Sequence, residues 1–205
     1  MVCCMKTICF GCHGAAKKRG MDDCPFCRTP KPENHDDALA MIQAQVLKKD
    51  PVAIHQLGLH IYQGGLGLQK DMQRAVELYT EAAQLGSIEA LFSIGSAYDL
   101  GKGAQQDKAK AAEFYRKAAM QGSVSARHNL GGYEGQKGNH GRAVRHYLIS
   151  AKMGLKESVA IIKLLFMGGL ATNEQHSEAL RGYQNAVEEM KSHDRDEAKR
   201  LRDRQ

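Results

Sequence analysis

One stretch of thirteen residues occurs four times along the chain, and this repetition limits the possible folds more than any other feature. The first copy, RAVELYTEAAQLG, begins at Arg74, and the spacings to the later copies are 36, 32 and 36 residues. Equivalent positions hold an alanine (Ala75, Ala111, Ala143 and Ala179) and a tyrosine (Tyr79, Tyr115, Tyr147 and Tyr183). Self-similarity at this period predicts a stack of supersecondary units, not a single domain of unique parts.

Each copy is predicted to be a helix followed by a turn. Ala75, Tyr79, Ala82 and Ala83 recur at i, i+4, i+7 and i+8, so they share one face. A glycine follows the last turn of three copies, where a left-handed residue is favoured, at Gly86, Gly122 and Gly154.

A partner helix precedes each copy. Four segments align without gaps at residues 50–58, 87–95, 123–131 and 155–163. Three of them end in a glycine (Gly58, Gly95 and Gly131), which costs about 1 kcal/mol inside a helix relative to alanine, so we expect tight packing there. Ser87 and Ser123 are expected to cap the first helices, and Asp71 and Asp107, at the ends of the linkers, to cap the second.

The combined pattern A-x-x-x-L-G, G-x-G-x-x-x-D and A-x-x-x-Y-x-x-A-A-x-x-G resembles the Sel1-like repeat family, a relative of tetratricopeptide repeats. The resemblance covers about residues 50–190. It implies an all-α, right-handed solenoid of about four helix pairs that holds protein partners on its concave face and carries no catalysis. The fourth unit departs from the pattern at Lys163 and Val187, as a capping unit does.

All cysteines of the chain lie in its first 27 residues: Cys3, Cys4, Cys9, Cys12, Cys24 and Cys27. Two C-x-x-C knuckles, at 9–12 and 24–27, are separated by eleven residues, and this is the spacing of zinc ligands. We expect a short helix between the knuckles. The chain shows no signal-peptide pattern, so zinc is favoured over disulfides or free thiols.

The string CCMKTICFGCHGAAKKRGMDDCPFCRTP resembles the C-terminal three-quarters of a RING finger, in which eight ligands bind two zinc ions in a cross-brace. The resemblance implies a complete site at Cys3, Cys4, Cys24 and Cys27 and a half-site at Cys9 and Cys12, whose partner pair has no counterpart here. Pro25 and Arg28 also match, and the resemblance implies that the arginine contacts ubiquitin and a ubiquitin-conjugating enzyme.

Two other arrangements of the cysteines stay open. A single ribbon-like site would use Cys9, Cys12, Cys24 and Cys27 as ligands, and Cys3 and Cys4 would then not bind the metal. In the other, the sequence begins inside the module and further ligands precede Met1. We favour the RING-like arrangement because the whole string matches, not the knuckles alone.

The charge distribution and the hydropathy of the chain disfavour several classes of function. The net charge of +6 falls largely in the two end segments and not along one face, which disfavours nucleic-acid binding. No apolar run approaches the ~18 residues of a membrane span, so we expect an intracellular, cytoplasmic or nuclear protein. The histidines are scattered over different helices, and we expect most of them on helix surfaces. No catalytic constellation emerges from the repeats.

These inferences predict four parts: a partial RING-type zinc finger (1–32), a linker and capping helix (33–49), Sel1-like repeats (50–190) and a charged tail (191–205). In the capping helix, Leu39, Ile42, Val46 and Leu47 are expected to form an apolar stripe, and Asp36 or Asp37 the cap. The leading hypothesis is a zinc-binding adaptor. The alternatives are a RING-type ubiquitin ligase whose repeats select the substrate, and a solenoid that carries only a remnant of the finger.

Overall fold

A computed structural model of the chain describes residues 3–6, 10–193, 196 and 200. Within these ranges the secondary structure is entirely helical, as the sequence predicted. The helices are α1 (Phe10–Lys18), α2 (His35–Val46), α3 (Pro51–Gln63), α4 (Met72–Gln84), α5 (Ile88–Leu100), α6 (Lys108–Met120), α7 (Val124–Gln136), α8 (His140–Lys152), α9 (Lys156–Met167) and α10 (Asn173–Glu189). None of the helices in these ranges is both long and apolar enough to cross a membrane.

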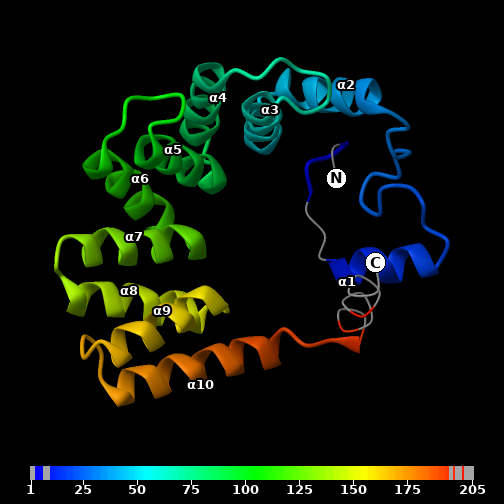
Figure 1. Ribbon diagram of the computed structural model, residues 1–205. Helices are drawn as coiled ribbons and strands as arrows, with labels where there is room; N and C mark the ends of the chain where they lie inside the picture. The colour runs from blue at the N-terminus through cyan, green and yellow to red at the C-terminus, as the bar shows by residue number, and fades with distance from the viewer. Residues whose placement is uncertain (1–2, 7–9, 194–195, 197–199, 201–205) are drawn as a thin grey trace. The chain divides into compact units, whose positions relative to one another are not determined.

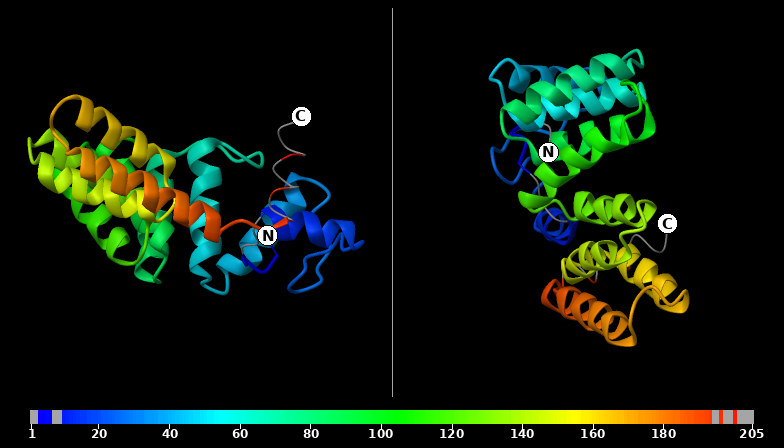
Figure 2. Two further views of the ribbon diagram at one scale, coloured as in Figure 1. Left: turned by 90° about the horizontal axis from the view of Figure 1, so that it is seen from below. Right: turned by 90° about the vertical axis from the view of Figure 1, so that its left-hand side faces the viewer.

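The chain divides into two compact units. Residues 1–87 and 191–205 form the first unit, and residues 88–190 form the second. In the first unit α2 packs on α3 and α3 on α4. In the second, consecutive helices from α5 to α10 pack on one another, and α10 also packs on α8, so α7 to α10 lie stacked (Figures 1 and 2). The four predicted helix pairs are therefore α3/α4, α5/α6, α7/α8 and α9/α10.

Most of the expected helix ends are confirmed. The Oδ1 atoms of Asp71 and Asp107 accept from Arg74 N and Lys110 N, each at 2.9 Å. Ser123 caps α7. Gly86, Gly122 and Gly154 have φ angles of 95°, 97° and 92°, so they adopt the predicted left-handed conformation.

The capping helix α2 differs from its prediction at two positions. Its N-cap is Asn34, whose Oδ1 accepts from Asp37 N at 2.9 Å, and not Asp36 or Asp37. Leu47 lies outside the apolar stripe, with 86% of its surface exposed, because the helix ends at Val46 and the chain turns away. Ile42 is fully buried, as expected.

The glycines inside α3, α5 and α7 lie against tyrosine rings, which confirms the predicted close packing. A Cβ built on Gly58 would stand 2.8 Å from Tyr79, and one built on Gly131 would stand 2.8 Å from Tyr147. The fourth pair replaces this glycine with the exposed Lys163, and there Tyr183 is only half-buried.

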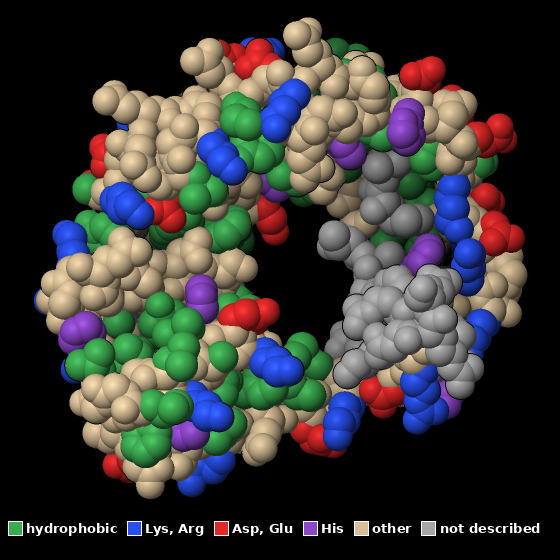
Figure 3. Space-filling model, in the orientation of Figure 1, with side chains coloured by type: hydrophobic (Ala, Val, Ile, Leu, Met, Phe, Trp, Pro, Cys, Tyr) green, Lys and Arg blue, Asp and Glu red, His purple; other side chains and the backbone are tan. Residues whose placement is uncertain are grey.

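The fourth pair also has an apolar outer surface. Leu164 and Met167 of α9 are 62% and 71% exposed, and Leu170 follows at 45%. Hydrophobic side chains gather visibly over α8, α9 and α10 (Figure 3). A terminal capping repeat has a polar outer face, and the exposed apolar residues of α9 depart from this.

Candidate functional site

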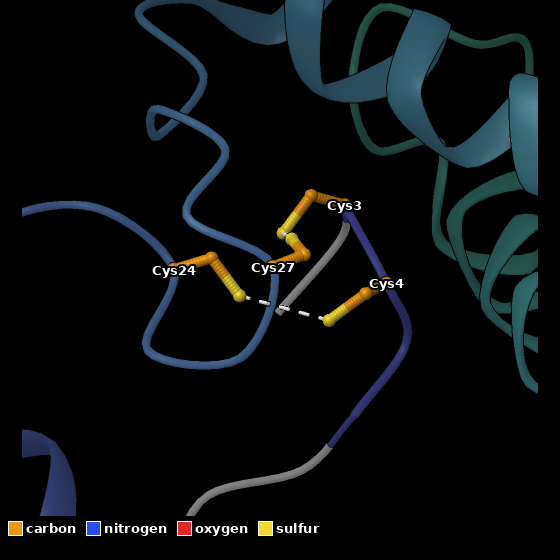
Figure 4. A group of neighbouring side chains, drawn as sticks. All are labelled: Cys3, Cys4, Cys24 and Cys27. Carbon is orange, nitrogen blue, oxygen red and sulfur yellow. Dashed lines mark hydrogen bonds between the residues drawn. The ribbon is translucent and has the colours of Figure 1, made fainter.

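Four cysteine sulfur atoms meet at the N-terminal end of the first unit. The Sγ atoms of Cys3, Cys4, Cys24 and Cys27 all lie within 4.8 Å of one another (Figure 4). Cys4 and Cys24 are 3.6 Å apart, and Cys3 and Cys27 are 3.5 Å apart. A disulfide bond measures about 2.05 Å, so these pairs are thiols held close together and not disulfides.

The spacing of the four sulfur atoms fits a zinc ion. Zinc–sulfur bonds of about 2.3 Å place the corners of a tetrahedron about 3.8 Å apart. The two short distances, 3.5 and 3.6 Å, are slightly below that edge, and the upper limit of 4.8 Å is above it. Small side-chain rotations would bring all four onto one ion.

The turn that carries two of these cysteines is closed by its own backbone. Cys24 N donates to Thr29 O and Arg28 N donates to Cys24 O, both at 2.9 Å. Arg28 completes the turn with a φ of 60°, a left-handed conformation that few residue types adopt readily. This compact loop fixes the direction in which the Cys24 and Cys27 side chains point.

The same loop stabilises thiolates. Burial raises the pKa of the Cys24 thiol, but backbone N–H groups of Cys27 and Phe26 outweigh it, and the net pKa is lowered. Hydrogen bonds from the side chain and backbone of Thr29 lower the pKa of Cys27 to about 6. These are the outer contacts that support metal-bound sulfur.

The other two thiols of the cluster, those of Cys3 and Cys4, have raised pKa values. Burial, together with the neighbouring Cys24 and Cys27 sulfurs, raises the pKa of Cys3 to about 12. Burial is also the main reason that the pKa of Cys4 is raised. Four negative charges cannot lie this close without a cation, since each thiolate disfavours the next. A divalent ion is what would allow all four to ionise together.

The remaining predicted site residues fall outside this cluster. Cys12 lies exposed on α1, and among the described residues it is not part of the group; Cys9 lies outside the described residues. Pro25 is half-buried and Arg28 exposed in the closed turn. Among the described residues, the four cysteines that the structure brings together are those of the complete site that the RING resemblance implies; Cys9, which the ribbon-like set needs, is not among the described residues.

The cluster is attached to the capping helix α2 and to α3, the first helix of the repeats. Gln45 Nε2 of α2 donates to the backbone oxygen of Cys3 at 2.6 Å. Met5, directly after Cys4, is 6% exposed and packs with Ile42 and Ala53. The segment that bears two of the four sulfurs is therefore part of the core formed by α2 and α3.

The expectation that the histidines lie on helix surfaces is wrong for several of them. His55 is buried, and its ring lies 5.3 Å from that of Tyr79. His128 lies 5.1 Å from Tyr147, and its Nδ1 is 2.7 Å from Ser158 Oγ. The sequence held a signal for this, because both occupy the repeat position that Phe92 fills in the second unit, against Tyr115.

Comparison with known proteins identifies the repeats. The Sel1 repeat family matches residues 51–87, 88–123 and 124–155, which together make up half of the chain. The fold is similar to that of a Sel1 repeat protein from Oxalobacter formigenes (TM-score 0.66, 23% identity, covering 87% of this chain and 71% of that one). It is also similar to c5321, a protective antigen with an SLR fold from uropathogenic Escherichia coli (TM-score 0.64, 24% identity, 89% of this chain and 38% of that one). No curated protein matches the chain.

Proposed function

We propose, because the chain belongs to the Sel1 repeat family, that it is an adaptor whose repeats hold a protein partner and whose N-terminal cysteine module binds zinc. The observation that carries this proposal is the unbroken run of three matched repeats from 51 to 155. Repeat proteins of this kind present extended surfaces to partners, since each unit adds area to the same face.

The cysteine module supports the adaptor as a structural zinc site. Four protein thiolates fill a tetrahedral coordination shell, so a zinc ion bound there keeps no open position for substrate or water. Four thiolates and one divalent ion leave a formal charge of −2. Lys6, Lys17, Lys18, Arg19 and Arg28 lie near it in sequence and offset that charge. A metal also supplies stability that a module this small cannot gain from its core.

The adaptor proposal is tested by co-purification from the cells that make the protein. The full chain is compared with a variant altered on the first helix of the third pair, Tyr133→Ala/Gln136→Ala. A matched control carries Glu113→Ala/Arg145→Ala, exposed positions on α6 and α8. We expect one protein to co-purify in stoichiometric amounts with the wild type and the control and to be lost with the first variant. No stoichiometric partner, or equal loss in both variants, contradicts the proposal.

A RING-type ubiquitin ligase is the second candidate, favoured by one observation. Arg28 is exposed and directly follows the last predicted ligand, in a turn that two backbone hydrogen bonds hold rigid. Such a ligase would act by holding a charged carrier enzyme in a reactive pose. Discharge of ubiquitin from a conjugating enzyme should then require Arg28, so Arg28→Ala loses activity and Lys31→Ala keeps it. A wild-type chain as inactive as Arg28→Ala eliminates this candidate.

A further inference from the structure

The second unit contains a small polar pocket on its repeats. It has a volume of about 200 Å³ and lies where α5, α6, α7 and α8 come together. The side chains that decide its chemistry are Asp99, Lys108, Tyr115, His128, Asn129 and Tyr133. Sites for drug-sized ligands measure about 300–1,000 Å³, so this pocket has room for a single side chain.

A glycine of the third repeat leaves this space open. Gly132 lines the pocket, and the other repeats place Leu59, Ser96 and Leu164 at the equivalent position. A Cβ at Gly132 would lie 3.6 Å from Tyr147 Oη, which is ordinary contact. Packing therefore does not demand glycine here, in contrast to Gly131 beside it. A larger side chain at Gly132 would project into the pocket.

A chain of buried hydroxyl groups leads to Nδ1 of His128. Ser150 Oγ donates to the backbone carbonyls of His146 and Tyr147, each at 3.1 Å. A hydroxyl has one proton, so when Ser150 directs its proton to these carbonyls, Ser158 is the donor in the 2.6 Å contact between the two hydroxyl groups.

In that arrangement Ser158 Oγ accepts from His128 Nδ1, 2.7 Å away, and the ring carries its proton on Nδ1. The nitrogen that remains for a ligand is Nε2, with its lone pair. Burial lowers the pKa of His128, which keeps this ring neutral near pH 7. With the proton on Nδ1, His128 offers the pocket a hydrogen-bond acceptor at Nε2.

A carboxylate lies in the same pocket. Asp99 is close enough to the Tyr115 hydroxyl to raise the pKa of that tyrosine, although burial is the larger cause, and hydrogen bonds to Ser96 and Asn129 act the other way. Lys108 Nζ is 3.3 Å from Asp99 Oδ1, and its side chain is 49% exposed. An ion pair this exposed is weak and screened, so Lys108 can be displaced by a better partner.

Two acceptors, the Asp99 carboxylate and His128 Nε2, thus line the pocket together with the ring of Tyr133. Two exposed cations lie beside it: Lys108, paired with Asp99, and Lys137, whose Nζ lies 4.6 Å from the centre of the Tyr133 ring. A carboxylate ligand would gain Lys108 but would face Asp99 and the lone pair of Nε2. A guanidinium offers planar, paired donors to both acceptors and stacks on a tyrosine face.

We propose that this pocket binds the guanidinium group of an arginine, with Asp99 and His128 as acceptors and Tyr133 as the stacking surface. The inference rests on the adaptor function in one respect, namely that the arginine belongs to a protein partner. It defines the chemistry of one contact point on that partner.

The test uses a small probe and the full chain. Backbone amide signals of ¹⁵N-labelled protein are followed by NMR during titration with N-acetyl-arginine methylamide. We expect saturable shifts in α7, much smaller shifts with the neutral isostere N-acetyl-citrulline methylamide, and none with N-acetyl-glutamate methylamide. Asp99→Asn should weaken binding at least about tenfold, because a charged hydrogen bond is lost. Glu113→Gln, an exposed carboxylate on α6 outside the pocket, should leave it unchanged.

A second variant, Gly132→Leu, fills the pocket and should abolish the shifts while the melting temperature is retained. The proposal is overturned by glutamate-derivative shifts as large as those with arginine, by arginine binding that survives in Asp99→Asn, or by the absence of saturable shifts. The probe requires no partner. If the probe does not bind, the arginine pocket is refuted but a co-purifying partner would still support the adaptor function. If no partner co-purifies, the adaptor function is refuted but binding of the probe would still support the pocket.

Discussion

Gly95 of α5 lies directly against the ring of Tyr115 of α6, so that a Cβ built on the glycine would stand 2.6 Å from both Cδ1 and Cε1. Tyr115 is almost completely buried, and Phe92 packs against it, with 5.7 Å between the ring centroids. The ring therefore has little room to move away. The same relationship joins Gly58 to Tyr79 and Gly131 to Tyr147.

This contact predicts that Gly95→Ala destabilises the protein, although alanine is the better helix former. Overpacking of a filled core costs about 1–3 kcal/mol. The control is Gly132→Ala, whose Cβ meets only an ordinary 3.6 Å contact and should gain up to about 1 kcal/mol from helix propensity. Urea unfolding of both variants checks the prediction. If Gly95→Ala is as stable as wild type, the contact does not explain the glycine.

The cysteine cluster predicts the zinc content of each cysteine variant. Purified wild-type protein should contain one zinc per chain by elemental analysis, and Cys3→Ser/Cys4→Ser should contain none. Cys12→Ser is the matched control and should keep the metal, because Cys12 is not part of the described cluster. A ribbon-like site at the two knuckles would give the reverse result: metal retained in the double variant and lost in Cys12→Ser.

Attachment of the cluster to α2 and α3 predicts where the effect of metal removal is felt. A chelator should speed hydrogen exchange in α2 and α3, because Cys3 and Met5 connect the site to that core. Exchange in α7 and α8, in the other compact unit, should not change. Gln45→Ala should reduce the effect by removing the bond to Cys3. Equal acceleration in both units, or none in α2, would refute this link.

Partly buried histidines predict that stability falls in mild acid. Burial lowers the pKa values of His60, His128 and His146 below the ordinary 6.5. Below about pH 6.5 the unfolded chain binds protons that the folded chain does not, so the free energy of unfolding decreases as the pH falls. Urea unfolding at about pH 7.5 and about pH 5.5 measures this loss. His128→Gln should show a smaller loss than wild type, and identical losses would contradict the assignment to His128.

Periodicity predicted the fold well because it reports packing directly. The sequence shows a small residue and a tyrosine at a regular spacing in each repeat, which predicts close packing. Gly58, Gly95 and Gly131 do lie against tyrosine rings. Individual exposures were harder to predict. Leu47 looked like part of an apolar stripe, but the helix stops one residue earlier and leaves it in solvent.

The two sites were predictable to different degrees. The spacing of the cysteines identified all the candidate ligands. It cannot distinguish the RING-like set from the ribbon-like set, because both sets contain Cys24 and Cys27. That distinction depends on which part of the chain folds back onto these two residues. The pocket was missed entirely. Its acceptors, Asp99 and His128, come from two repeats, and Nδ1 of His128 contacts Ser158 of another repeat, thirty residues away. Such a chain of hydrogen bonds leaves no local pattern.

The pairing of glycine and tyrosine also bears on how the chain acquires its structure. Each such pair joins residues within about twenty positions of one another, so it can form before distant parts of the chain meet. Folding can therefore start in any of the first three helix pairs and spread to its neighbours. The fourth pair lacks the contact, and we expect it to form last, on a template supplied by α8.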